Sequence, residues 1–287
     1  MPDPSPPSPP DPLESPPYTL WHPMIVALLE RFLPLGYKLF PEFLLSRLSQ
    51  RVDILVVRQE ATPPGPVEKI HSILDYLGAH TLIEYKGPTD DLAGDDMLTL
   101  LGYAYQYMRV SKLKQPADVC LMVVADRITR SFLDQAKRCG VDLTETETES
   151  GIWRGKGCGF VMHGVETGKA SGQGPSEHLL YTFSRAFLAD PTRNRPVDEE
   201  ERRVYHWLYQ QVQQFKQARG PMAVKDVATF EEGWMQMLDS ISAEHPEFVA
   251  RTLAHASPAK RLEGLGVDDV LEGLSPDLLE ALKRRLH

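Results

Sequence analysis

The sequence contains few cysteines and no long apolar run. Its three cysteines, Cys120, Cys139 and Cys158, form neither a CxxC pair nor the spacing of a zinc site. An odd number of separated thiols argues against a disulfide framework and is typical of a reducing cytoplasm. No segment reaches the roughly 18 consecutive apolar residues of a membrane span, and residues 1–17 lack the pattern of a signal peptide. We therefore expect a cytoplasmic protein with no membrane contact.

The sequence also lacks an excess of positive charge and the common hydrolase motifs. Its net charge of −9 argues against a protein that coats nucleic acid through overall charge, although an acidic chain can still hold a basic cleft. There is no HExxH and no GxSxG, and GKGCG at 155–159 lacks the P-loop pattern and is expected to be a turn. These absences exclude the motif-defined zinc proteases, α/β-hydrolases and P-loop NTPases.

Composition divides the chain into four regions. Residues 1–17 hold nine prolines and are expected to form a disordered, partly polyproline tail. Residues 18–190 alternate strand and helix patterns, and residues 191–256 have a helical pattern. Residues 257–287 contain a weak nine-residue repeat, LEGLGVDDV followed by LEGLSPDLL, which predicts short helical turns. We expect an α/β core, a helical C-terminal region, and a tail that either caps the fold or binds a protein partner.

Hydrophobic patterns within residues 18–190 predict a sheet with helices. The expected elements are a helix over His22–Phe32, strands over Tyr37–Leu45 and Arg51–Arg58 joined as a hairpin, a short helix near Val67–Leu77, a strand over His80–Lys86, a helix over about 95–112, a strand over Asp118–Ala125, a helix over 130–139, and strand-like runs near 151–154, 159–164 and 179–183.

Three details of these elements can be tested. The run over Asp118–Ala125 is almost entirely apolar, which predicts a strand buried on both faces. Thr129 and Gly140 suit the N-terminal and C-terminal caps of the helix between them. The apolar stripe of the helix over 95–112 that is expected to face the sheet consists of Leu98, Leu101, Tyr105 and Met108.

The strongest chemical signal is IEYK at 83–86, with Asp53 upstream. Side chains alternate faces along a strand, so Glu84 and Lys86 point the same way. Asp53 is a single carboxylate within an otherwise apolar run, and it can meet this pair if the two strands are neighbours. The alternative is a Glu/Lys pair that only solvates one face of a strand.

Such a cluster suits phosphodiester hydrolysis. The carboxylates of Asp53 and Glu84 and the backbone carbonyl of Tyr85 are hard oxygen ligands of the kind that Mg²⁺ takes, and Mn²⁺ can substitute for it. The cation polarises the phosphoryl group and helps to generate hydroxide. A lysine beside it, here Lys86, can orient or deprotonate the attacking water or stabilise the developing negative charge.

The order of elements resembles the core of the PD-(D/E)XK nuclease superfamily. The stretch HTLIEYKGPTDDLAGDDMLTLLGYAYQY at 80–107 resembles uncharacterised bacterial members near the recombination-promoting nuclease, or transposase-like, group. The Leu-Glu-Gly-Leu-Ser-Pro tail is similar to repeats that end many of those proteins. The resemblance covers roughly residues 20–190 and, more weakly, 257–287. It implies a restriction-endonuclease-like mixed sheet flanked by helices.

The resemblance also implies roles for individual residues. Asp53 and Glu84 would hold the metal, and Lys86 would be catalytic. Glu30 resembles the carboxylate that many members place on the first helix, and Glu42 on the first strand is a competing candidate.

Two departures from the family pattern remain. Val52 stands where the motif has proline, and the long interval between Asp53 and Glu84 requires residues 59–79 to loop out of the sheet.

Candidate contacts to nucleic acid follow the ExK motif. Gln106, with Tyr103 and Tyr107, resembles the polar pair that some family members carry on the helix after the motif. A locally basic stretch could position phosphates without reading bases, or could be an ordinary solvated surface. The basic residues chosen as candidates are Arg109, Lys112, Arg127 and Arg130.

The sequence therefore predicts a Mg²⁺-dependent DNA endonuclease acting in recombination, mobile-element or defence biology. A homodimer is one expected assembly, because cutting both strands of a duplex is simplest with two sites. The rival hypothesis is a catalytically silent nuclease-fold protein that acts as an interaction or regulatory module. The intact Asp53, Glu84 and Lys86 favour the enzyme, whereas the acidic net charge and the repeats favour the module.

Overall fold

The computed structural model describes most of residues 18–190 and three short segments beyond them. The chain divides into two compact units, residues 1–237 and 238–287, and every described residue belongs to the first. The expected tail over 1–17 and the repeats over 257–287 lie outside the described residues. The described residues are 18–19, 21–45, 50–59, 63, 65–172, 174–190, 201–208, 210–211 and 224–225.

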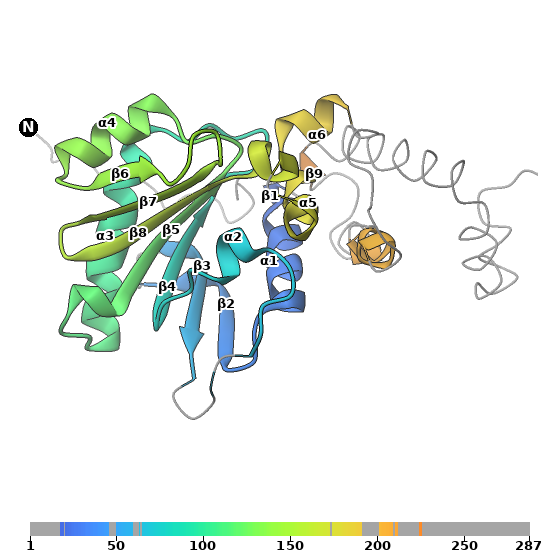
Figure 1. Cartoon of the computed structure of the whole chain (residues 1–287). Helices are drawn as coiled ribbons and strands as arrows, with labels where there is room; N and C mark the ends of the chain where they lie inside the picture. Colours follow the sequence, from blue (N-terminus) through green and yellow to red (C-terminus); the bar gives the residue numbers. More distant parts are fainter. Residues whose placement is uncertain are drawn as a thin grey trace, which may run out of the picture. The chain divides into compact units, whose positions relative to one another are not determined.

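The secondary structure alternates between strands and helices (Figure 1). The elements are β1 (Tyr18–Thr19), α1 (Trp21–Phe32), β2 (Tyr37–Leu44), β3 (Arg51–Arg58), α2 (His71–Leu74), β4 (His80–Tyr85), α3 (Gly94–Ser111), the short 3-10 helix η1 (Pro116–Asp118), β5 (Val119–Ala125), α4 (Arg130–Arg138), β6 (Asp142–Glu145), β7 (Ile152–Gly157), β8 (Phe160–Glu166), the 3-10 helices η2 (Thr167–Gly172) and η3 (Pro175–Glu177), α5 (His178–Tyr181), α6 (Arg185–Ala189) and β9 (Val224–Lys225).

The main sheet has seven strands in the order β2-β3-β4-β5-β8-β7-β6. The pairs β2–β3 and β3–β4 are antiparallel, whereas β4, β5 and β8 run parallel. The predicted hairpin is confirmed, and β3 pairs directly with β4, so the segment between them loops out without separating the strands. The architecture is thus an α/β mixed sheet flanked by helices.

The crossover from β4 through α3 to β5 builds the core on one face of the sheet. Seven apolar residues of β5 are fully or nearly buried, which confirms a strand covered on both faces. α4 continues this layer. Thr129 Oγ1 accepts a hydrogen bond from the Phe132 N–H at 3.2 Å, which confirms the predicted N-cap. Gly140 has a φ of 72°, the left-handed conformation expected just after a helix.

The predicted apolar stripe of α3 is half wrong. Leu101 and Met108 are buried, but Leu98 and Tyr105 are 50% and 52% exposed. The true core stripe is rotated around the helix toward positions with smaller or more flexible side chains. Its members are Met97, Leu100, Leu101, Ala104, Tyr107 and Met108.

The opposite face of the sheet packs against α1 and the chain after β8. The ring of Phe183 contacts Trp21 of α1 at 6.3 Å and Tyr85 of β4 at 6.2 Å between centroids. In Figure 1, α1, α5 and α6 gather on the right of the sheet, while α3 passes behind its strands. Helical residues 201–208 pack on the same unit, and the Tyr205 hydroxyl donates to the His178 carbonyl at 3.2 Å.

Three sequence predictions of local structure need correction. The apolar run at 179–183 is mostly the helix α5, because a short apolar run buried on all sides carries no period that separates strand from helix. β6 was not predicted, since its sequence DLTE is polar. β9 lies where a helix was expected, and it pairs in parallel with β1.

The turn predicted at GKGCG is confirmed. It joins β7 to β8 through Cys158 and Gly159, whose φ values of 52° and 83° are those of a type I′ hairpin turn. Among the described helices, none has both the length and the apolar character required to cross a membrane.

Candidate active site at the end of β4

Asp53 and Glu84 lie opposite each other on neighbouring strands. Ile54 pairs with Ile83, so the next antiparallel position brings Asp53 of β3 to Glu84 of β4. Leu82, two residues before Glu84 on β4, belongs to the core under α3, which places Glu84 on the α3 side of the sheet. Asp53 Oδ2 accepts the Tyr85 N–H at 2.9 Å.

Lys86 follows β4 directly and joins two acids. Its Nζ lies 3.2 Å from Glu84 Oε1 and 2.9 Å from Asp96 Oδ1. Asp96 stands in the first turn of α3, where its Oδ2 also accepts the Ala93 N–H at 2.7 Å. Sequence reasoning missed Asp96 because an acid at a helix start is ordinarily only a cap. The structure gives it a second contact, which holds the lysine.

Burial is the largest cause of the pKa shifts of the two carboxylates. It raises the pKa of Glu84 to about 7, and the neighbouring Asp53 charge adds to the effect. Burial likewise raises the pKa of Asp53, although the Tyr85 N–H and then His22 and Lys86 oppose the shift. Two neighbouring carboxylates, the half-buried Asp53 and the buried Glu84, therefore resist ionising together.

Lys86 responds in the opposite direction. Burial alone lowers its pKa, but Glu84 and Asp96 outweigh burial and raise it above its ordinary value. The side chain is therefore an ammonium at neutral pH. Of the three roles that the sequence allowed, this geometry favours orientation of a water or stabilisation of negative charge over proton abstraction.

The structure brings Glu42, and not Glu30, to the carboxylates. Pro41 pairs with Ile54 and Phe43 with Val52, so Glu42 lies opposite Asp53, and its charge contributes to the raised pKa of Asp53. Its φ of 46° is unusual for a strand residue and redirects the chain there. Its Oε2 accepts a hydrogen bond from Arg51 at 2.8 Å.

Glu30 is exposed near the end of α1. The residue that α1 directs toward Asp53 is His22 in its first turn, about 12 Å along the helix axis from Glu30. Trp21 anchors this turn, since a Cβ at Gly87 would lie 3.0 Å from Trp21 Cδ1. Sequence reasoning did not identify His22, because no local pattern distinguishes it.

Tyr103 and Gln106 extend the site along α3. Burial, and then the charges of Glu84 and Asp53, raise the pKa of Tyr103, so its hydroxyl lies within electrostatic reach of the carboxylates. Gln106 Nε2 donates to Gln50 Oε1 at 2.7 Å, which ties α3 to the residue before β3. Tyr103 and Gln106 therefore lie on the same side of the sheet as Glu84, whereas Tyr107 is buried in the core with its hydroxyl 2.7 Å from His80 Nδ1.

The four basic candidates do not form one patch. α3 leads from the C-terminal end of β4 to the N-terminal end of β5, and the two strands are parallel. Arg109 and Lys112 at the far end of α3 therefore lie at the opposite end of the sheet from Lys86. Arg127 and Arg130 follow β5 and lie at the same end as Lys86, where both are exposed.

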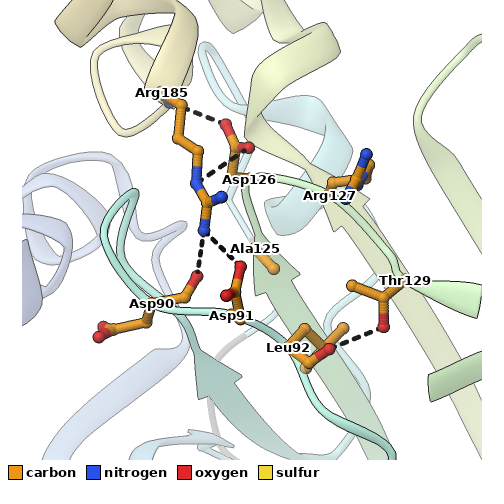
Figure 2. A pocket seen from close by; sticks show the side chains of 8 residues that line it. All are labelled: Asp90, Asp91, Leu92, Ala125, Asp126, Arg127, Thr129 and Arg185. Atoms are coloured by element: carbon orange, nitrogen blue, oxygen red, sulfur yellow. Dashed lines mark hydrogen bonds and ion pairs between the residues drawn. The ribbon is translucent and has the colours of Figure 1, made fainter. Parts of the chain in front are cut away.

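The loop between Lys86 and α3 is held by Arg185 (Figure 2). Arg185 Nε donates to the Pro88 carbonyl at 2.7 Å, and Nη2 lies 2.6 Å from Asp91 Oδ1. The Arg185 N–H donates to Asp126 Oδ1 at 2.8 Å. Thr129 Oγ1 donates to the carbonyl of Leu92 at 2.7 Å. These contacts fix the loop that separates Lys86 from Asp96, and the sequence offered no signal for them.

Asp53 and Glu84 are the residues that could hold a divalent cation. Within the described ranges, no three His, Cys, Asp or Glu side chains are grouped to hold a metal ion. Mg²⁺, however, is commonly bound through one or two carboxylates and keeps several waters. The raised pKa values of Asp53 and Glu84 indicate that their negative charge is incompletely compensated by the protein. No protein-family model, curated protein or solved structure matches the chain.

Proposed function

We propose that this protein is a metal-dependent endonuclease that hydrolyses DNA phosphodiester bonds on a PD-(D/E)XK-type core. The observation that carries the proposal is the meeting of two neighbouring carboxylates, the half-buried Asp53 and the buried Glu84, with the ammonium group of Lys86 at one end of the sheet. The order α1–β2–β3–β4–α3–β5 is the order on which the family resemblance rests. The direct pairing of β3 with β4 also removes the difficulty of the long interval between the motif residues.

The chain's own groups suggest a division of work. Asp53, Glu84 and the backbone carbonyl of Tyr85 would hold Mg²⁺ or Mn²⁺, which when bound supplies polarisation of the phosphoryl group. Lys86 would donate to the oxygen that gains charge as water attacks phosphorus. Asp96 would position the ammonium group.

DNA would approach the end of the sheet at which β4 and β5 terminate. Arg127 and Arg130 are exposed there and could contact phosphates, which position a duplex without reading its sequence. The acidic net charge of −9 predicts weak binding, and the few cations that take part predict only a shallow fall of affinity with salt, because the slope is proportional to the number of phosphates neutralised. A role in recombination, mobile-element or defence biology is part of the same proposal.

The test is cleavage of supercoiled plasmid and single-stranded DNA with Mg²⁺, Mn²⁺ or EDTA. Lys86→Ala should reduce metal-dependent cleavage on the order of 100-fold or more, while DNA binding is retained. Lys38→Ala is the matched control, since Lys38 is an exposed lysine of β2. Glu84→Ala should lower Mg²⁺ affinity as well as rate. Equal cleavage by wild type and Lys86→Ala would assign the activity to a contaminant or to another site.

A second candidate is a catalytically silent nuclease-fold protein that acts as an interaction or regulatory module. The two ion pairs of Lys86 favour this candidate, because its ammonium group is already paired with Glu84 and Asp96 within the protein. A wild type that cuts no nucleic acid with any of the metals, yet binds a protein through the face containing Glu84, would support this candidate and overturn the enzyme.

A further inference from the structure

One face of α3 is exposed although it is partly apolar. Leu98 and Tyr105 are two of only five large hydrophobic residues that are strongly exposed within the described part of the chain. Gly102 is exposed between them, and Asp95 and Arg109 are exposed toward the two ends of the helix. At 100° per residue these five positions share one side of the helix, opposite the stripe that packs on the sheet.

The described residues give Gly102 no packing role. A glycine in a helix interior costs roughly 0.5–1 kcal/mol relative to alanine. At most other described glycines a close neighbour explains the residue, as at Gly87 against Trp21, or a positive φ does, as at Gly140. A Cβ at Gly102 would meet no atom within 4 Å. The missing side chain therefore leaves a notch that only a molecule outside the described fold can use.

The charges on this face are arranged symmetrically about the notch. Asp95 lies seven residues before Gly102, and Arg109 lies seven residues after it. Neither forms an ion pair with another residue that the structure describes. Seven residues are almost two helical turns, so all three side chains lie nearly in line, about 10 Å apart along the axis.

Tyr105 is held in a fixed position beside the notch. Its ring contacts Phe160 edge to face at 5.1 Å between centroids, and its hydroxyl donates to the Cys158 carbonyl at 3.4 Å. An exposed aromatic ring that is already ordered loses little entropy on binding, which is a property of residues that anchor interfaces.

We propose that two copies of this chain associate through α3, with the helices antiparallel and crossing at Gly102. The two-fold arrangement brings Asp95 to the partner's Arg109 and Arg109 to the partner's Asp95. Leu98 then lies near the partner's Tyr105, and the absent side chain at Gly102 allows the helix backbones to approach closely. A surface that complements itself in this way is the requirement for a two-fold interface.

A second copy explains this face better than nucleic acid does. One acidic residue, one basic residue and an apolar centre give the face no net charge, whereas DNA requires cations along its backbone. One helix pair makes a small interface, so we expect a dimer that dissociates in the micromolar range. The inference is independent of nuclease activity, because none of its residues contacts the carboxylates.

The experiment is sedimentation velocity of the full chain up to about 100 μM, with thermal unfolding as a check on folding. Wild type should dimerise. Asp95→Arg or Arg109→Asp alone should weaken the dimer on the order of tenfold or more, because each change creates two like-charge contacts. The double variant should restore the dimer, since the reversed charges pair again. Asp134→Arg, on the exposed side of α4, is the matched control and should dimerise like wild type.

Gly102→Leu gives a second test by filling the notch. It should abolish the dimer while leaving the unfolding temperature unchanged or raised, because leucine favours helix more than glycine does. A monomeric wild type at the highest concentration would overturn the proposal. So would a dimer that is unaffected by Gly102→Leu and by both single charge changes, since that would place the interface elsewhere. If the Gly102→Leu variant fails to fold, the double charge reversal still tests the proposal, because it should restore the dimer that each single charge change weakens.

Discussion

Replacing Glu84 with glutamine should make the folded protein more stable at pH 8 and leave it nearly unchanged at pH 4. Burial, and then the Asp53 charge, raise the pKa of Glu84 from its ordinary 4.5 to about 7. The folded chain therefore binds this proton more tightly than the unfolded chain does. The free energy of unfolding is then highest below pH 4.5 and falls as the pH rises to about 7. Glutamine resembles the protonated acid and removes this fall.

The size of the effect follows from the two pKa values. Each tenfold change in proton affinity is worth about 1.4 kcal/mol, so full ionisation of Glu84 costs roughly 3 kcal/mol above pH 7. The attraction to Lys86 is already included, because it lowers the same pKa. Asp53 titrates together with Glu84, so the measured change belongs to the pair.

The assay is urea unfolding in EDTA at intervals from pH 4 to pH 8, with Glu147→Gln as an exposed control. We expect the stability of wild type to fall relative to Glu84→Gln across this range. Added Mg²⁺ at pH 8 should raise the stability of wild type by about 2.7 kcal/mol at a hundredfold excess over Kd, which nearly closes its gap to Glu84→Gln, because only wild type keeps both carboxylates. Parallel curves for wild type and Glu84→Gln from pH 4 to pH 8 would refute the reasoning.

Three further outcomes test the framework around the site. Thr129→Ala should cost about 1–2 kcal/mol in urea unfolding, because it removes the cap of α4 and the bond to the loop before α3. Arg185→Ala should speed amide hydrogen exchange at residues 88–91 and change exchange in β5 little, because Arg185 holds this loop. The same increase in exchange rate in the loop and in β5 would contradict this role of Arg185. Deleting residues 257–287 should leave cooperative unfolding of the core unchanged by calorimetry, unless the repeats are part of its structure.

The sequence predicted most elements of the first unit because their signals are local. Seven of the eight α-helices and strands from α1 to α4 match their predicted bounds within about two residues, and only α2 is shorter than predicted. The alternation of side chains along a strand was also enough to place Glu84 and Lys86 on one side. No tertiary information is needed for either inference, since both depend on residues close together in the chain.

The exposed and buried faces of α3 show where local patterns fail. Leu98 and Tyr105 are as apolar as the residues that face the sheet, so periodicity alone permits several orientations of the helix. The sheet selects the side with Met97 and Ala104, because small or flexible side chains allow α3 to lie close to β5. The apolar residues left outside are those of the proposed dimer face.

The sequence by itself determined most of the secondary structure from α1 to α4 and the shared side of Glu84 and Lys86, because these follow from periods of a few residues. Only the tertiary structure decided which other groups meet them. Strand register brings Asp53 and Glu42 together, and the position of α3 brings Asp96 to Lys86. Glu30, chosen by resemblance, lies too far along α1 to join them. Contacts between distant residues depend on register and helix placement, which the packing of the whole core sets.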